Sequence, residues 1–294
     1  MEKKSCCSPG PSKQASNIAQ STSLKGEIRK RYGELAKAQG GSCGCTAQAT
    51  TDLQGGSCCE TSSCNLNPGY SIEDIQSLPE KAVSASAGCG NPTALAGLKE
   101  GETVLDLGSG GGIDVFIAAK KVGSKGKAIG VDMTPEMIDL ARSNASQSGL
   151  DNVEFRLGEI EHLPVADGSV DVIISNCVIN LSTDKDAVFK EAYRVLKKGG
   201  RILVSDVMAE GLPKEVREDL TSWAQCVGGA LALNDYTNKI KAAGFKEVDI
   251  VSNSEYSKEF ITDSISSMND IDKDLLKNIE GVKVSHAEIS ARKT

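Results

Sequence analysis

The sequence predicts an α/β protein with a doubly wound, mostly parallel sheet of seven strands, and three observations support this fold class. Short apolar segments alternate with amphipathic segments of helix length between about residues 92 and 208. A run of glycines directly follows the first strand-like segment, and lysines and glycines end the helix-length segments. Regular alternation of this kind is typical of parallel strands in one sheet with helices covering both faces.

The elements of this core are predicted from their periodicity and from their end signals. Asn91-Pro92 fits a helix N-cap followed by proline at the first helical position. Strands are expected over residues 102–108, 127–133, 152–158, 170–176 and 201–207. Helices are expected over residues 112–123, 135–149 and 187–200, the last of which ends in a Lys-Lys-Gly-Gly run.

The segments on either side of this core have a different character. Residues 1–65 are expected to form a flexible, cysteine-rich arm, with a short helix over residues 24–39. Residues 66–208 are expected to form the main domain, and residues 209–294 a lid followed by strands that complete the sheet. In this last part, helical patterns over 215–231 and 236–245 precede strand patterns over 246–253 and 282–293.

Charge and hydropathy exclude two classes of partner. Lys and Arg number 33 against 40 Asp and Glu, so the net charge of −7 argues against a nucleic-acid binder. No apolar stretch approaches the ~18 residues of a membrane span, and the first residues lack the apolar centre of a signal peptide. We therefore expect a cytosolic protein with no membrane partner, in which the 10 cysteines are reduced and serve as ligands or reactive groups.

The glycine loop after the first strand is the first motif that indicates a ligand-binding site. In VLDLGSGGG (104–112), Gly108 and Gly110 would let the backbone turn tightly and approach a ligand. Asp106 precedes this loop and Asp132 ends the next strand, near the distance expected for a ribose-binding carboxylate. An acid before the first glycine fits poorly beside a pyrophosphate and well beside a cationic amino group. The pair of acids therefore favours S-adenosylmethionine over a dinucleotide, whose fingerprint would also place glycine at Ile113.

These motifs resemble the class I S-adenosylmethionine-dependent methyltransferases over about residues 92–208. The resemblance implies that Asp106 holds the amino group of the cofactor, while Asp132 binds its ribose hydroxyls. Further cofactor contacts are implied by position for Gly108 and Gly110 beneath the ligand, Met133, Glu159 and Ile160 around the adenine, and Asn176 near the methionine part.

Three cysteines fall where the sheet would place its ligand. Cys177 directly follows the fourth strand, Cys89 lies two residues before the Asn91 cap, and Cys226 lies in the expected lid. A three-thiolate site suits a soft, thiophilic centre with a lone pair, such as trivalent arsenic. Zinc commonly takes four ligands in C-x₂-C spacings, which do not occur here, so no structural metal is expected.

With the runs GCGNP, NCVINL and CVGGAL, the chain resembles the arsenite methyltransferase family over most of residues 27–245. The resemblance implies that Cys177 and Cys226 bind arsenic, and that Cys89 is a third, redox-active thiol. It also implies a disulfide between Cys89 and an N-terminal cysteine. Cys58 or Cys59 fits the spacing of that partner, while the run around Cys43 and Cys45 resembles a stretch in some members. Cys6 and Cys7 could capture arsenic or be idle.

We therefore predict an arsenite methyltransferase that acts in arsenic detoxification and transfers methyl groups from S-adenosylmethionine to thiol-bound arsenic. Its expected partners are arsenite or its glutathione conjugates, with thioredoxin or glutathione as reductant, and the protein is expected to be a monomer. Two alternatives stay open at this point. One is a methyltransferase of a small organic molecule, and the other is a thiol protein that binds the metalloid without catalysis.

Overall fold

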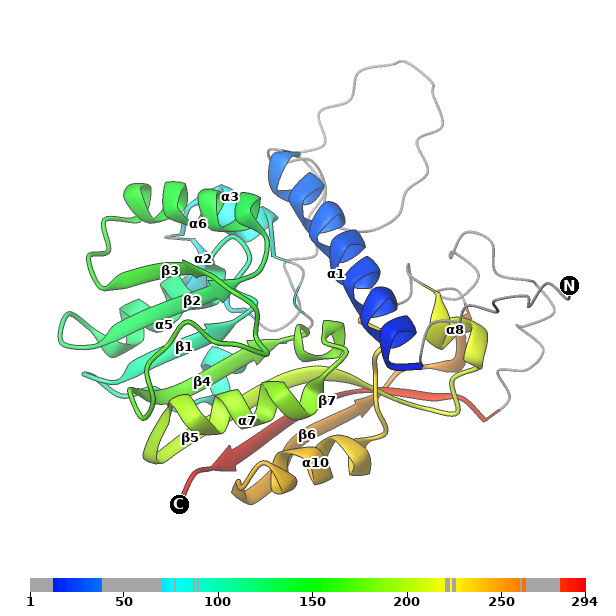
Figure 1. Ribbon diagram of the computed structural model, residues 1–294. Coiled ribbons are helices and arrows are strands. Elements are labelled where there is room, and N and C mark those ends of the chain that lie inside the picture. The colour runs from blue at the N-terminus through cyan, green and yellow to red at the C-terminus, as the bar shows by residue number, and fades with distance from the viewer. Residues whose placement is uncertain are drawn as a thin grey trace, which may run out of the picture.

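The computed structural model describes residues 13–38, 70–76, 78–86, 88, 90–219, 223, 226–259, 261–262 and 281–294 (Figure 1). The strands are β1 (Thr103–Leu107), β2 (Lys127–Asp132), β3 (Val153–Leu157), β4 (Val170–Asn176), β5 (Leu196–Glu210), β6 (Lys246–Glu255) and β7 (Lys283–Arg292). The helices are α1 (Lys13–Lys37), α2 (Ile72–Ile75), α3 (Glu80–Ser84), α4 (Pro92–Leu95), α5 (Ile113–Val122), α6 (Pro135–Ser148), α7 (Lys185–Val195), α8 (Lys214–Glu218) and α10 (Leu233–Ala242), with a 3₁₀ turn η1 (Ile179–Leu181). No helix in these described ranges is long and apolar enough to span a bilayer.

The seven strands form one sheet in the order β3-β2-β1-β4-β5-β7-β6. Strands β1 to β5 pair with one another in parallel, while β7 is antiparallel to both β5 and β6. The strand order reverses between β1 and β4, and open α/β sheets bind ligands at the carboxyl ends of the strands at such a point. The predicted fold class is confirmed.

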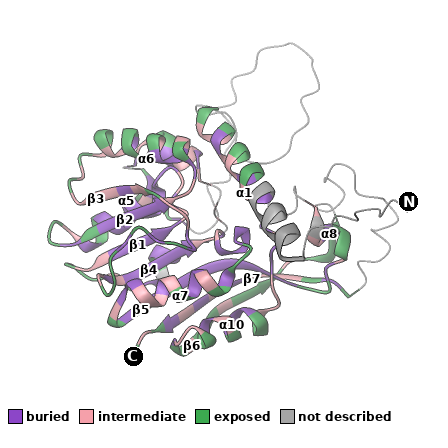
Figure 2. Ribbon diagram, viewed as in Figure 1, coloured by how far each residue is buried: buried purple, intermediate pink, exposed green. Residues whose placement is uncertain are grey.

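Helices cover both faces of the sheet. Helices α5 and α6 bury Phe116 and Ile138 in one core cluster, while α7 and α10 bury Phe189 and Tyr236 in the cluster on the opposite face. Figure 2 shows buried residues concentrated on the strands and on the helix surfaces turned towards them. Because both faces of the sheet are covered, its carboxyl edge is the place left for a site.

The predicted end signals act as expected at several helices. Asn91 Oδ1 accepts a hydrogen bond from the Ala94 N–H at 2.9 Å, and Pro92 is the first residue of α4. Helix α6 starts at Pro135 and is followed by Gly149, whose φ of 68° permits a left-handed C-terminal turn. Strand β7 and most of β6 also lie where the strand patterns predicted them.

Three predicted boundaries were wrong. The helix expected through residue 200 ends at Val195, because Leu196 pairs with Val170 and starts the 15-residue strand β5. Helix α1 begins at Lys13, well before the predicted start at residue 24. In the segment expected to be helical over 215–231, helix α8 already ends at Glu218, and residues 226–230 form turns.

Candidate active site

A cavity opens at the carboxyl ends of β1, β2 and β4, with a volume of about 940 Å³ that includes its open mouth. The cavity brings together most of the site residues predicted from the sequence: Asp106, Gly108, Gly110, Asp132, Met133, Ile160, Asn176 and Cys177.

The glycine loop passes along the cavity in a backbone conformation that suits glycine. Gly108 has φ 70° and donates its N–H to the Val131 carbonyl at 2.8 Å. A Cβ on Gly108 would lie 2.2 Å from Val178 Cγ2, so a side chain has no room there. Gly110 has φ 48° and donates its N–H to Asp132 Oδ2 at 3.0 Å. The loop is therefore hydrogen-bonded to the end of β2 and lies close against Val178, which follows β4.

Asp132 ends β2 with its carboxylate fixed by backbone donors. The Gly110 N–H reaches Oδ2 at 3.0 Å and the Thr134 N–H reaches Oδ1 at 2.8 Å. Burial raises the pKa of this carboxyl, and the two backbone donors act against that rise. Each oxygen of the oriented carboxylate can accept a further hydrogen bond, so the group can bind a pair of ribose hydroxyls.

Asp106 and Asp114 add two buried carboxyls to the same cavity. Burial raises the pKa of Asp106 well above its usual value, and the charges of Asp114 and Asp132 raise it further. Burial also raises the pKa of Asp114 to about 6. Asp114 Oδ2 accepts from the Tyr70 hydroxyl at 2.8 Å, while its Oδ1 is buried with no hydrogen-bond partner in the described part of the chain. Three carboxyls this close favour a cationic ligand, since a nearby positive charge stabilises their ionised forms.

Asp114 is a site residue that the sequence reasoning missed. It lies in the first turn of α5, where an acid is ordinarily explained by the helix dipole. The available signal was its place two residues after the glycine run, since that turn of the helix must face the ligand.

Asn176, expected near the methionine part of the cofactor, lines the cavity and also binds a neighbouring backbone segment. Its Nδ2 donates to the Gly90 carbonyl at 2.7 Å, and its Oδ1 accepts from the Gly90 N–H at 3.2 Å. Nδ2 also donates to the Tyr70 hydroxyl at 3.0 Å. A Cβ on Gly88 would lie 2.3 Å from Nδ2. The side chain thus holds the segment around Gly88 and Gly90 against the end of β4.

Of the residues expected beside the adenine, Ile160 lines the cavity, whereas Glu159 pairs with helix α1. Glu159 forms ion pairs with Lys25 at 2.7 Å and with Arg29. The acid whose side chain helps to line the cavity is Glu161, which accepts from the Ser182 hydroxyl at 2.7 Å.

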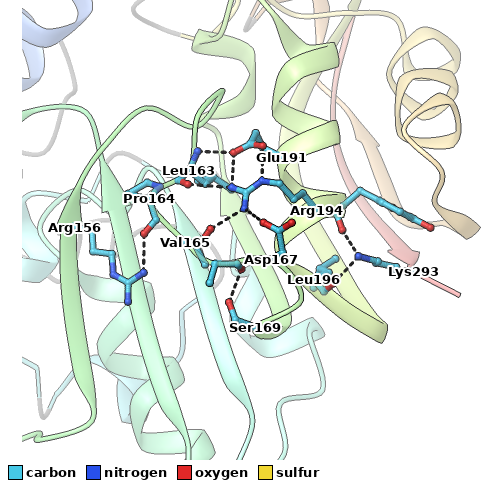
Figure 3. A network of polar contacts seen from close by, with 12 residues as sticks. Arg156, Leu163, Pro164, Val165, Asp167, Ser169, Glu191, Arg194, Leu196 and Lys293 are labelled. Carbon is cyan, nitrogen blue, oxygen red and sulfur yellow. Dashed lines mark hydrogen bonds and ion pairs between the residues drawn. The ribbon is translucent and has the colours of Figure 1, made fainter.

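A polar network anchors the segment that follows Glu161 (Figure 3). Arg194 of α7 donates to the carbonyls of Leu163 at 3.1 Å and Val165 at 2.9 Å, and pairs with Glu191 and Asp167. Glu191 also accepts from the Leu163 N–H at 2.8 Å. These bonds fix the chain beyond Glu161, and therefore help to fix the wall of the cavity.

Cys177 and Cys226 meet at one side of the cavity. Both are buried, and the Cys226 thiol donates a hydrogen bond to the Cys177 carbonyl at 2.7 Å. Cys177 has φ 57° and Cys226 has φ 65°, a left-handed conformation that is uncommon outside glycine. Strained backbone of this kind clusters at functional sites, where the surrounding structure has to impose it.

The two cysteines differ in oxidation state. Cys177 takes part in a disulfide, whereas Cys226 is free. Burial raises the pKa of the Cys226 thiol, and the charge of Asp206 raises it further. The other predicted cysteines, Cys89, Cys58 and Cys59, lie outside the described residues, as do Cys6, Cys7, Cys43 and Cys45.

Comparison with known proteins places this site in a family. A family model described as "Methyltransferase domain" matches residues 98–271. The structure of an arsenic(III) S-adenosylmethionine methyltransferase from Chlamydomonas reinhardtii superposes with a TM-score of 0.59 and 38% identity, over 70% of this chain and 68% of that one. The chain belongs to the arsenite S-adenosylmethionine methyltransferase family. The family predicted from the sequence is therefore confirmed.

Two curated relatives agree with this membership. An arsenite methyltransferase of Halobacterium salinarum is 46% identical over 271 residues, which are 90% of this chain and 66% of the relative. One of Aquipseudomonas alcaligenes is 43% identical over 226 residues, which are 74% of this chain and 63% of the relative. The chain thus spans about two thirds of the length of these curated relatives.

The cofactor of this family, S-adenosylmethionine, fits the residues that line the cavity. The buried carboxyls of Asp106 and Asp114 suit its cationic amino group, and the oriented Asp132 suits its ribose. Met133 and Ile160 line the cavity and would supply apolar surface for its adenine.

Proposed function

We propose that this chain transfers a methyl group from S-adenosylmethionine to trivalent arsenic held by cysteine sulfurs, and so takes part in arsenic detoxification. The observation that carries the proposal is the hydrogen bond between Cys226 and the Cys177 backbone, beside a cavity lined by buried carboxyls. A pair of cysteines beside a cation-binding pocket suits a thiophilic acceptor better than an oxygen or nitrogen acceptor, which would need a base.

The cofactor supplies a methyl group on a positively charged sulfur. Asp106 and Asp114 would orient its amino group, and Asp132 would fix its ribose, so that the sulfonium faces the cysteines. Cys177 lines the cavity itself and Cys226 contacts Cys177, so arsenic bound there is adjacent to the cofactor. Positioning of this kind lowers the barrier because the reacting atoms are held close and aligned.

The transfer needs no base because arsenic(III) attacks with its lone pair. The arsenic–carbon bond forms as the sulfur–methyl bond breaks, and the electron pair of that bond stays on sulfur, giving S-adenosylhomocysteine. Arsenic is thereby oxidised by two electrons. Two thiolates of the chain, for which we propose Cys89 and an N-terminal cysteine such as Cys58 or Cys59, return those electrons and form a disulfide. An external dithiol then resets the pair by thiol–disulfide exchange.

The disulfide at Cys177 bears on the same cycle. A sulfur already bonded to sulfur cannot bind arsenic, so Cys177 must be reduced before it can act as a ligand. We propose that thioredoxin or glutathione supplies this reduction in the cytosol, and that the enzyme acts as a monomer on arsenite or its glutathione conjugate.

The test is an assay of the purified chain with S-adenosylmethionine, arsenite and a dithiol. S-adenosylhomocysteine should appear together with methylated arsenic, and omitting the dithiol should abolish turnover. Cys89→Ser, Cys177→Ser and Cys226→Ser should each lose arsenite-dependent turnover while retaining cofactor binding.

Two outcomes would overturn the proposal. If Cys177→Ser keeps full activity and arsenite does not change cofactor turnover, the acceptor is an organic molecule. If arsenite binds tightly and no S-adenosylhomocysteine forms, the chain is a metalloid-binding protein.

A further inference from the structure

Helix α1 forms a wall of the cavity and shares an apolar cluster with the two cysteines. Lys25, Ile28 and Tyr32 line the cavity, and their spacing of three and four residues places them on one face of the helix. Leu24 and Ile28 are 5% and 1% exposed, and they pack in the same apolar cluster as Cys177 and Cys226. The helix is therefore part of the site, although it lies far from the glycine loop in the sequence.

Tyr32 connects this helix directly to a cysteine. Its side chain packs against the apolar cluster that contains Cys226 and is hydrogen-bonded to the Cys226 side chain. The Cys226 thiol in turn donates to the Cys177 carbonyl at 2.7 Å. Two hydrogen bonds in series thus run from α1 through Cys226 to the residue after β4.

Ion pairs on either side of Tyr32 hold α1 in this orientation. Lys25 pairs with Glu159 at 2.7 Å and with Glu161 at 3.1 Å. Towards the other end of the helix, Lys37 pairs with Glu136 at 2.9 Å. Because the helix is tied on both sides of Tyr32, it cannot rotate the hydroxyl away from Cys226 without breaking these pairs.

We infer that Tyr32 is a positioning residue for the arsenic-binding cysteine: its hydroxyl orients the Cys226 sulfur towards Cys177, and its ring shields that sulfur from water. The inference rests on the proposed function and deepens it. None of the sequence motifs from which the site was predicted lies in α1.

Arsenic binding would affect the two hydrogen bonds of Cys226 differently. A sulfur bound to arsenic has lost its proton and can no longer donate to the Cys177 carbonyl. The Tyr32 hydroxyl can still donate to it, and a hydrogen bond to an acceptor of higher negative charge is the stronger one. Tyr32 therefore stabilises the arsenic-bound state more than the free one, which is the property of a residue that contributes to affinity.

The first arm of the test compares Tyr32→Phe with wild type in arsenite methylation. Phenylalanine keeps the ring and removes the hydroxyl, so KM for arsenite should rise about fivefold, as expected for one lost hydrogen bond. The kcat and the KM for S-adenosylmethionine should stay within twofold of wild type. Lys30→Ala, a change at an exposed position of the same helix, is the matched control and should change none of these values. An unchanged arsenite KM in Tyr32→Phe would show that the hydroxyl does not position Cys226.

The second arm needs no arsenic and measures how fast iodoacetamide alkylates Cys226, by mass spectrometry of the peptide that contains it. Cys226 is 5% exposed, so it should react slowly in wild type, in Tyr32→Phe and in Lys30→Ala. Tyr32→Ala removes the ring and should speed alkylation at least about tenfold, since buried thiols react mainly through their exposure. A wild-type rate in Tyr32→Ala would overturn the shielding role. If Tyr32→Ala does not fold, Tyr32→Leu replaces it with the same expected direction.

The two arms separate this inference from the proposed function. Failure of wild-type protein to methylate arsenite would refute the proposed function, whereas the alkylation arm would still decide whether Tyr32 covers Cys226.

Discussion

The two sides of the cavity are built in different ways. The carboxylate side, made of Asp106, Asp114 and Asp132, comes from one strand–loop–helix–strand stretch of 27 residues. The cysteine side, made of Cys177 and Cys226, joins residues 49 positions apart and is covered by α1 from near the other end of the chain. The first side is a local motif and the second is a product of tertiary packing.

Each side also carries a different kind of unfavourable free energy before its ligand binds. On the carboxylate side, burial raises the pKa values of all three acids, and the charges of the other two raise that of Asp106 further. On the cysteine side, two non-glycine residues hold left-handed backbone. A bound cation stabilises the ionised carboxyls and so relieves the cost on that side. The backbone strain on the cysteine side persists, because the left-handed conformation is what presents the sulfurs. The two sides should therefore respond independently to mutation.

The largest expected effects test this independence. Cys226→Ser should weaken arsenite binding by roughly a hundredfold, because a hydroxyl is a poor ligand for a soft centre, and should leave cofactor affinity unchanged. Asp132→Asn should weaken S-adenosylmethionine binding roughly ten- to hundredfold through lost charge-assisted hydrogen bonds, and should leave arsenite affinity unchanged. Titration calorimetry with each ligand on the reduced protein measures both.

Asp139→Asn, at an exposed position of α6, is the control for Asp132→Asn and should behave as wild type. If Cys226→Ser lowered cofactor affinity as much as arsenite affinity, the two sides would be one coupled unit.

Asn176 is expected to matter to both sides, because its side chain joins the end of β4 to Gly90 and Tyr70. Asn176→Ala would leave the Gly90 N–H and carbonyl without these partners, which should cost about 2 kcal/mol of the free energy of unfolding. Urea denaturation of the reduced protein measures this change. A loss of less than about 0.5 kcal/mol would mean that solvent replaces these bonds and that the side chain does not hold the segment.

Asp114→Asn should separate stability from cofactor binding. The folded-state pKa of about 6 lies above the ordinary carboxyl value, so the stability linked to this group is present at low pH and is lost as pH rises through 6. An amide mimics the protonated acid, so at pH 7.5 the variant without cofactor should melt about 2–4 °C higher than wild type.

The same substitution should weaken S-adenosylmethionine binding about tenfold, since it removes a negative charge facing the cation. Wild-type affinity should likewise fall as pH is lowered through 6, and the fall should be smaller in Asp114→Asn, where Asp106 still titrates and Asp114 does not. Calorimetry from pH 5 to pH 8 checks both, and a parallel pH profile in the two proteins would exclude Asp114 as a cofactor ligand.

The smallest expected effect concerns the backbone of the cysteine side. Because Cys226 has φ 65°, Cys226→Gly should be more stable than Cys226→Ala by about 1 kcal/mol, the reverse of the order at ordinary positions. Denaturant midpoints of the two variants measure the difference. Equal stability would show that the left-handed conformation is not maintained once the thiol is gone.

The carboxylate side was largely predictable from the sequence because its geometry is local. The glycines follow a buried strand directly, and Asp132 ends the next parallel strand, so adjacency in the sheet follows from the order of the elements. The exception was Asp114, whose role depends on burial and on the distant Tyr70 hydroxyl. Neither of these is visible in the residues around it.

The cysteine side was predictable only in part. The spacing of Leu24, Ile28 and Tyr32 indicates a helix, but nothing in it states that the helix packs over Cys226. The resemblance implied Glu159 beside the adenine and did not point to Glu161, because a turn has no fixed side-chain alternation. Here a bridge between Glu159 and His162 reverses the chain and turns the second acid towards the cavity.

The position of β7 has a consequence for the order of folding. The last strand along the chain lies between β5 and β6 and pairs with β5 from Arg201–Arg292 to Glu210–Lys283. During synthesis, the strands that carry the cofactor residues can therefore pair while β5 still has an open edge. Such edges are prone to intermolecular pairing, and closing this one requires contacts across more than seventy residues. Until β7 pairs with β5, the nascent chain is thus open to aggregation through this edge.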